Sequence, residues 1–182
     1  MVDETRLFVR LAHTHKPDCV MSLDGTMPKA VPSPDELAVV FGSDEVARYA
    51  ANCRPIYEDL RRIIGQMSGL AILARLTERR EIRDLPELQN CESRWKQASE
   101  RLSSLSAPAG TVEHKAQLEA ALDFCRLAMG TFSEIRGQAT LNEMLDLAGL
   151  QIKRAYTHLQ AASSAKAKLE MVDFSHACCC GR

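Results

Sequence analysis

Aromatic side chains are scarce in this sequence, and its charges nearly cancel. Only 5% of the residues are Phe, Trp or Tyr while 46% are hydrophobic, so a core must be built mainly from aliphatic side chains. This composition favours helices over a β-sandwich. The formal net charge is −1, from 23 basic and 24 acidic side chains. It excludes an overall field that would attract nucleic acid or an anionic membrane, and we expect no nucleic-acid partner.

Long apolar runs are also missing, and we expect no secretion signal in the N-terminal residues. No stretch reaches the roughly 18 consecutive apolar residues of a transmembrane helix, so we expect no membrane span. The first residues, Met1–Arg6, are acidic before they are apolar, unlike a secretory signal peptide. The seven cysteines show no spacing typical of a secreted disulfide framework, which favours a reducing compartment. We therefore expect a cytoplasmic protein.

Regular structure is predicted to begin at Ser33. The Ser33 hydroxyl can cap a helix, Pro34 suits the first helical position, and Glu36 can reach back to the cap. Gly42 predicts the end of this short helix. A second short helix is expected up to about Asn52.

Pro55 should then begin or kink the next element, because proline lacks the N–H of the helical ladder. Residues 1–32 contain four Pro or Gly residues and no sustained period, so they are expected to form an irregular N-terminal arm.

Four further stretches repeat apolar residues every three or four positions, the period of an amphipathic helix. They run from Pro55 to about Glu81, from Asp84-Leu85-Pro86 to Leu105, from a capping Thr111 to Gly137, and from a capping box at Thr140–Glu143 to about Leu169. Short connections force neighbouring helices to run in opposite directions. We predict an all-α fold, an antiparallel (up-down-up-down) four-helix bundle with two short N-terminal helices, in a domain of residues 33–170.

Residues 171–182 form a Cys-rich C-terminal tail in which His176 precedes Cys178, Cys179 and Cys180. Thiolate and imidazole are ligands for thiophilic metal ions such as Zn or Cu, and exposed thiols are redox-labile. Adjacent cysteines lack the C-x₂-C spacing of a zinc finger. The tail is also a candidate for acylation, or for prenylation at the poor box formed by its last four residues. A terminus without a role is the remaining interpretation.

A second candidate metal group lies in the N-terminal arm. His13 and His15 would share one face of an extended segment, and Cys19 follows them as a third possible ligand. If the arm met the tail, these residues would complete a site with His176. Two solvent-facing histidines on a loop are the simpler interpretation.

The stretch from Ile63 to Ala74 has few polar atoms. Gly65 and Gly69 lie one turn apart within it, and each costs helix propensity of about 1 kcal/mol relative to Ala. We therefore expect something to approach the backbone there: a neighbouring helix of the same chain, a second copy, a partner helix or an apolar ligand. The candidate interface residues are Gly65, Gly69, Leu70 and Leu73.

Known catalytic patterns are missing, including a P-loop, G-x-G-x-x-G, His-Glu-x-x-His, G-x-S-x-G and the Glu-x-x-His pair of di-iron bundles. Cys91, Cys125 and Trp95 fall on apolar stripes and are expected in the core. We predict a non-catalytic helical-bundle interaction protein that self-associates as a homo-oligomer, a homodimer in the simplest case. One alternative is a thiol-dependent metal-binding or redox protein that uses His176 and Cys178–Cys180. Another is a carrier body whose Cys-rich tail is modified by other enzymes.

Overall fold

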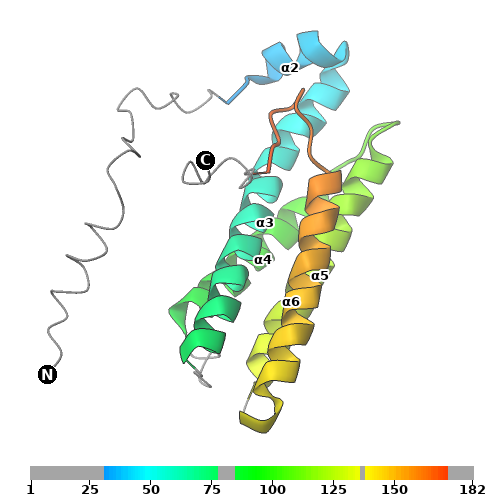
Figure 1. Ribbon diagram of the computed structural model, residues 1–182. Helices are drawn as coiled ribbons and strands as arrows, with labels where there is room; N and C mark the ends of the chain where they lie inside the picture. The colour runs from blue at the N-terminus through cyan, green and yellow to red at the C-terminus, as the bar shows by residue number, and fades with distance from the viewer. Residues whose placement is uncertain (1–30, 78–84, 136–137, 172–182) are drawn as a thin grey trace, which may run out of the picture. The chain divides into compact units, whose positions relative to one another are not determined.

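The computed structural model describes residues 31–77, 85–135 and 138–171, and most of these are helical (Figure 1). The helices are α2 (Pro34–Phe41), α3 (Asp44–Thr77), α4 (Pro86–Ser104), α5 (Val112–Glu134) and α6 (Gln138–Ala161). The described part of the chain contains no strand, only an isolated bridge between Ser164 and Leu169. The all-α prediction is therefore confirmed. None of the described helices is both long enough and apolar enough to cross a membrane.

The start of α2 follows the sequence prediction. Ser33 Oγ accepts a hydrogen bond from the Glu36 N–H at 3.2 Å, and a Glu36 carboxylate oxygen accepts one from the Ser33 N–H at 2.8 Å. This reciprocal capping box satisfies two amides that the helix itself leaves unpaired. Gly42 ends α2 in a left-handed conformation with φ 66°, which glycine adopts without a steric penalty.

Helix α3 runs without interruption through Pro55. The predicted second short helix ending near Asn52 is therefore wrong, because it forms the first part of the 34-residue α3. A proline inside a helix removes one backbone hydrogen bond and costs about 3 kcal/mol. Cys53 and Ile56, on either side of the proline, are both fully buried. Breaking the helix would expose these turns, and their burial offsets the local penalty.

Two predicted capping interactions are also wrong, although Thr111 does stand at the N-cap position of α5. The Thr111 hydroxyl donates to the Pro108 carbonyl at 2.8 Å instead of accepting from the first turn of α5. Helix α6 begins at Gln138, so the predicted capping box at Thr140 lies inside the helix. Glutamine and alanine are good helix formers and extend α6 by these residues. The predicted helix signals at Asp84 and Gly137 lie outside the described residues.

The last helix ends earlier than its apolar pattern suggested. Helix α6 stops at Ala161, not near Leu169, and residues 162–171 form a segment that we call the C-terminal strap. Within it, Ser164 and Leu169 exchange two backbone hydrogen bonds of 2.8 and 2.9 Å. The Ser164 hydroxyl oxygen accepts from the Ala167 N–H, a local bond that competes with helix formation. Leu169 nevertheless stays in the core, with 1% of its surface exposed.

Residues Pro32–Met171 pack as one compact unit. Helix α3 contacts each of the other four described helices. Helix α5 packs against both α4 and α6. The predicted seams are buried between them. In α6, for example, the buried positions are Leu141, Leu145, Ala148, Ile152, Ala155 and Leu159.

Candidate functional site

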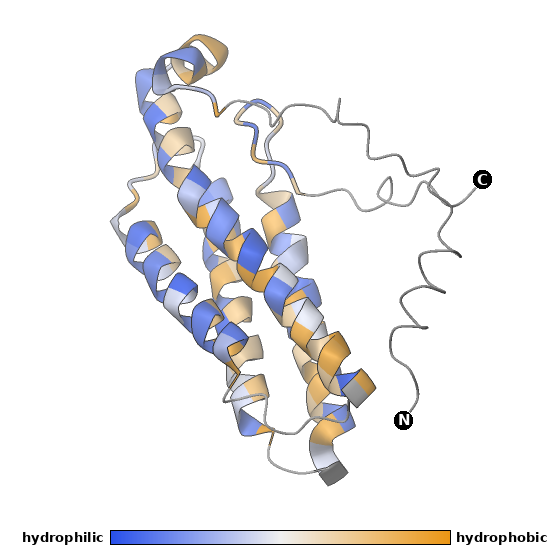
Figure 2. Cartoon of the chain, turned by 90° about the vertical axis from the view of Figure 1, so that its left-hand side faces the viewer, coloured by the Kyte–Doolittle hydropathy of each residue, from blue (hydrophilic) through white to orange (hydrophobic). Residues whose placement is uncertain are grey.

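An apolar surface runs along the side of α3 that faces away from the core. We call the residues Gly65, Gly69, Ile72 and Leu76 the outer stripe, because their spacing of four, three and four places them on one helix face. Ile72 is 61% and Leu76 79% exposed, and both glycines are exposed as well. Figure 2 shows hydrophobic colour along the C-terminal half of this helix. The opposite face holds the buried residues Ile63, Met67, Leu70 and Ala74.

The two glycines do not serve packing within the described part of the chain. A Cβ atom built on Gly65 or Gly69 meets no atom within 4 Å. The expectation that a neighbouring helix of the same chain approaches them closely is therefore wrong for the described residues. Each glycine destabilises its helix by about 1 kcal/mol without an intramolecular contact in return.

The four predicted interface residues divide between surface and core. Gly65 and Gly69 lie on the outer stripe, and Leu73 lies beside it with 44% of its surface exposed. Leu70 is only 5% exposed and packs in the core. Sequence reasoning did not name Ile72 or Leu76 as interface residues, although both continue the spacing of the two glycines.

A shallow groove between α3 and α6 continues the outer stripe sideways. Its volume is about 350 Å³, and Ile72 lines both the groove and the stripe. Small residues, Ser68 and Ala71 on α3 and Gly149 on α6, leave room for it. Lys153 is the one Lys, Arg, Asp or Glu among the described lining residues, so the groove offers an apolar floor with a single cation.

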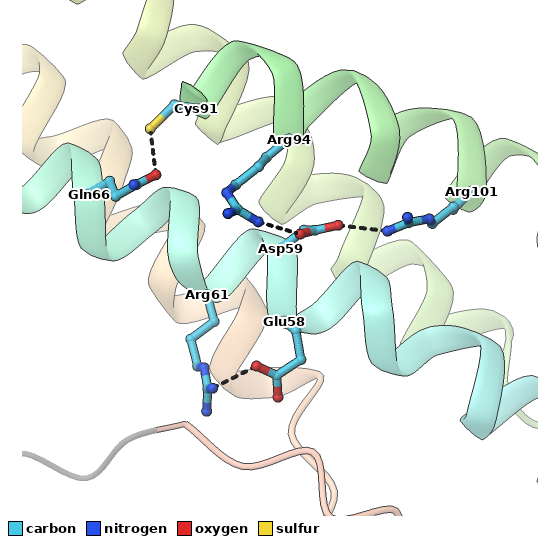
Figure 3. Close-up of polar contacts among 7 residues, drawn as sticks. All are labelled: Glu58, Asp59, Arg61, Gln66, Cys91, Arg94 and Arg101. Carbon is cyan, nitrogen blue, oxygen red and sulfur yellow. Dashed lines mark hydrogen bonds and ion pairs between the residues drawn. The ribbon is translucent and has the colours of Figure 1, made fainter. Parts of the chain in front are cut away.

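Ion pairs border this surface. Arg75 on α3 pairs with Asp146 on α6, and both side chains are largely exposed. Toward the N-terminal end of the stripe, Arg61 pairs with Glu58 at 2.6 Å, shown in Figure 3. Each end of the outer stripe therefore carries one acidic and one basic side chain.

A buried carboxylate joins α3 to α4 on another side of the helix. Asp59 is 7% exposed and accepts from Arg94 at 3.3 Å and from Arg101 at 2.8 Å (Figure 3). Such a pair of charge-assisted bonds offsets the desolvation of the carboxylate. Because both arginines are engaged by Asp59, we assign this cluster to helix packing.

The surroundings of the three described cysteines do not activate their thiols as nucleophiles or metal ligands. Cys53, Cys91 and Cys125 are fully buried, which confirms the core prediction for the latter two. Burial raises the pKa of Cys53 and of Cys91 to about 11, and that of Cys125 further still. They stay protonated at neutral pH, and a thiol is a poor nucleophile and metal ligand. Trp95 is half-buried and donates from Nε1 to the Leu122 carbonyl at 2.9 Å, as expected of a core anchor.

The predicted metal ligands His13, His15, Cys19, His176 and Cys178–Cys180 all lie outside the described residues. Within residues 31–77, 85–135 and 138–171, no group of three or more His, Cys, Asp or Glu side chains could hold a metal ion. The outer stripe and its adjoining groove are thus the described surface that best matches a sequence-predicted site. Comparisons of the chain with protein-family models, with curated proteins and with solved structures find no match.

Proposed function

We propose that α3, α4, α5 and α6 form an antiparallel, up-down-up-down bundle. Polar contacts between α3 and α4 support opposite directions. Asp59 contacts Arg101, whereas Gln66, two turns further along α3, contacts Cys91, which lies earlier on α4. Partner numbers that fall on one helix as they rise on the other are characteristic of an antiparallel pair.

Contacts between α5 and α6 follow the same rule. Gln117 hydrogen-bonds to His158 at 2.8 Å, and Thr131 to Gln151 at 2.8 Å. The α4–α5 connection is short, residues 105–111, as antiparallel neighbours require.

Spin-label distances test this topology. Labels at Arg48 on α3 and Ser104 on α4 should lie close together, since both residues line one cavity. Labels at Arg48 and Glu87 should lie further apart by most of the length of α4, about 25 Å at 1.5 Å per residue. The reverse order of distances would rule out the bundle.

We propose further that the protein is a non-catalytic interaction protein that self-associates through the outer stripe. The observation that carries this proposal is the apolar continuity of an exposed helix face: two glycines with open space above them, followed by Ile72 and Leu76 at 61% and 79% exposure. Contiguous exposed apolar surface of this kind is typical of interaction sites. Gly65 and Gly69 would then be explained by the close approach of another backbone.

The partner that this face fits is a second copy of the chain. The stripe has a narrow half, Gly65 and Gly69, and a bulky half, Ile72 and Leu76. A two-fold axis at the level of Leu70 and Ala71 would bring Gly65 of each copy level with Leu76 of the other, and Gly69 level with Ile72. Bulky side chains would then occupy the space over the glycines on both sides, as an isologous interface requires.

The ion pairs are compatible with this arrangement. Arg75, which pairs with Asp146 on α6, would lie level with the uncharged Gln66 of the other copy. The Glu58–Arg61 pair precedes the stripe and would lie beyond the level of Leu76 of the other copy. Within the stripe, no like charges are therefore brought level. One helix face with its groove is small for a protein interface, which predicts weak association.

Sedimentation velocity at about 1–500 μM tests self-association. Leu76→Glu should raise the dissociation constant about tenfold or more, because it places a carboxylate where burial of an isobutyl group contributes about 1.5–3 kcal/mol. Val39→Glu is the matched control, since Val39 is 85% exposed on α2 and away from the stripe. Leu70 is unsuitable for the test because its substitution would disturb the core.

Two results would contradict self-association through this face. One is a wild-type chain that stays monomeric over the whole concentration range. The other is a dimer that Leu76→Glu and Val39→Glu affect equally. Circular dichroism of each variant shows whether it retains the wild-type helix content.

A further inference from the structure

The C-terminal strap is held on the helices through its main chain. Arg54 on α3 donates to the Ala167 carbonyl and, at 3.2 Å, to the Lys168 carbonyl. Arg61 donates to the Glu170 carbonyl at 3.4 Å. In these three hydrogen bonds the acceptors are main-chain carbonyl oxygens.

Beneath this strap lies a cavity of about 330 Å³ that is half open to solvent. Its walls come from α2, α3, α5, the α4–α5 connection and the strap, and include Phe41, Val46, Ala50 and Leu169. None of the described residues that line it is Asp, Glu, Lys or Arg. At about 30 Å³ per water, the space equals roughly eleven water molecules, which suits a molecule of one or two rings.

One wall of the cavity carries a hydrogen-bonded pair, Tyr49 and His114. The His114 Nε2 atom lies 2.9 Å from the Ala162 carbonyl, which can only accept, so Nε2 carries a proton. Burial lowers the pKa of His114, which is therefore neutral near pH 7. Nδ1 then accepts from the Tyr49 hydroxyl at 2.9 Å. The Tyr49 hydroxyl also lies 3.4 Å from the Thr111 carbonyl. Its oxygen keeps lone pairs that can accept a hydrogen bond from a ligand.

We propose that this cavity binds a small, uncharged, mostly apolar molecule with a single hydrogen-bond donor, and that the C-terminal strap is its lid. The lining excludes a charged ligand, because a buried charge needs an opposite charge or several hydrogen bonds. Apolar walls with one polar pair are the usual composition of small-molecule sites. The strap contributes Ser164, Ala167 and Leu169 to the lining, so a ligand bound there contacts the strap and stabilises its position. This inference does not depend on self-association.

Indole is the probe, because it is neutral and two-ringed and has one N–H donor, and benzoate is the charged comparison. Titration of the full chain by calorimetry gives both affinities. Ala50→Leu fills the cavity from α3, where Ala50 is 6% exposed. Ala71→Leu makes the same change on the same helix but in the α3–α6 groove, and serves as the control.

Indole should bind the wild type and Ala71→Leu equally, and Ala50→Leu about tenfold more weakly or worse. Benzoate should bind the wild type at least about tenfold more weakly than indole. Equal indole affinity in a folded Ala50→Leu variant, or benzoate binding as tight as indole, would overturn the proposal. If Ala50→Leu does not fold, nuclear Overhauser effects on the wild type decide: contacts from indole to Val46 and Leu169 methyl groups support the site, and their absence refutes it.

Discussion

Replacing both Gly65 and Gly69 with alanine should stabilise the folded chain while weakening its self-association. Both residues lie within α3, and neither has an atom within 4 Å of a built Cβ. Alanine then introduces no clash. Each substitution should stabilise the folded chain by about 1 kcal/mol, because alanine loses less backbone conformational entropy on folding than glycine does. The double variant should gain about 2 kcal/mol. For a chain of this size that corresponds to a rise in Tm of roughly 4–8 °C.

Association should change in the opposite direction. In the proposed two-fold arrangement, the methyl groups of both alanines enter space that Ile72 and Leu76 of the other copy occupy. Overpacking of this kind costs about 1–3 kcal/mol, which raises the dissociation constant by roughly 5- to 150-fold. Urea denaturation at about 1 μM reports the monomer, and sedimentation velocity at high concentration reports the dimer.

Gly130→Ala is the matched control for this prediction. Gly130 also lies inside a helix, α5, and a Cβ there meets no atom within 4 Å. It should stabilise the monomer by about 1 kcal/mol and leave association unchanged. If the Gly65→Ala/Gly69→Ala monomer were less stable than the wild type, the claim that the space above these glycines is open would be wrong. If the monomer were stabilised and its association unchanged, the second copy would not contact Gly65 and Gly69.

Two other predictions concern the strap and its histidine. Arg54→Ala should lower the free energy of detaching the strap by about 1–2 kcal/mol. Tryptic cleavage at the exposed Lys166, followed by mass spectrometry, should then be roughly 5- to 30-fold faster. Arg62→Ala, which changes an exposed arginine of the same helix, should leave the cleavage rate unchanged. Burial lowers the pKa of His114 below its ordinary value of 6.5, so the unfolded chain takes up the proton first and stability falls as pH drops through that value. His114→Gln should flatten this dependence in urea titrations from pH 5 to 8, and a slope equal to that of His158→Gln would contradict it.

The period of apolar residues was enough to predict the helices and their buried stripes, because residues spaced by three or four positions lie on one helix face and are buried together. It could not predict the continuity of α3 at Pro55, where a local cost is outweighed by burial against residues distant in sequence. It also could not predict that α6 ends before Leu169. Leu169 fits the helical period, but the hydroxyl of Ser164 redirects the backbone and still leaves Leu169 buried.

The candidate site was predicted in part for a related reason. Residues 63–74 are apolar around most of the helix, so the sequence indicated an unusual surface without showing which side faces the core. Leu70 was therefore assigned to the interface although it is buried, and Leu76 was missed although it is 79% exposed. The cavity under the strap had no sequence signal, since Tyr49 and His114 come together only through the packing of α3 against α5.

The hydrogen bonds from Arg54 and Arg61 to the strap tolerate changes in the strap's amino-acid sequence. Every amino acid carries the carbonyl oxygen that these guanidinium groups bind, so these three hydrogen bonds do not select the side chains at positions 167, 168 and 170. Constraint should concentrate at two places. Position 167 must stay small, because its side chain is 2% exposed, and position 168 must accept a left-handed backbone, with φ 51° in the present lysine. Glycine or asparagine would suit that second position better than lysine does.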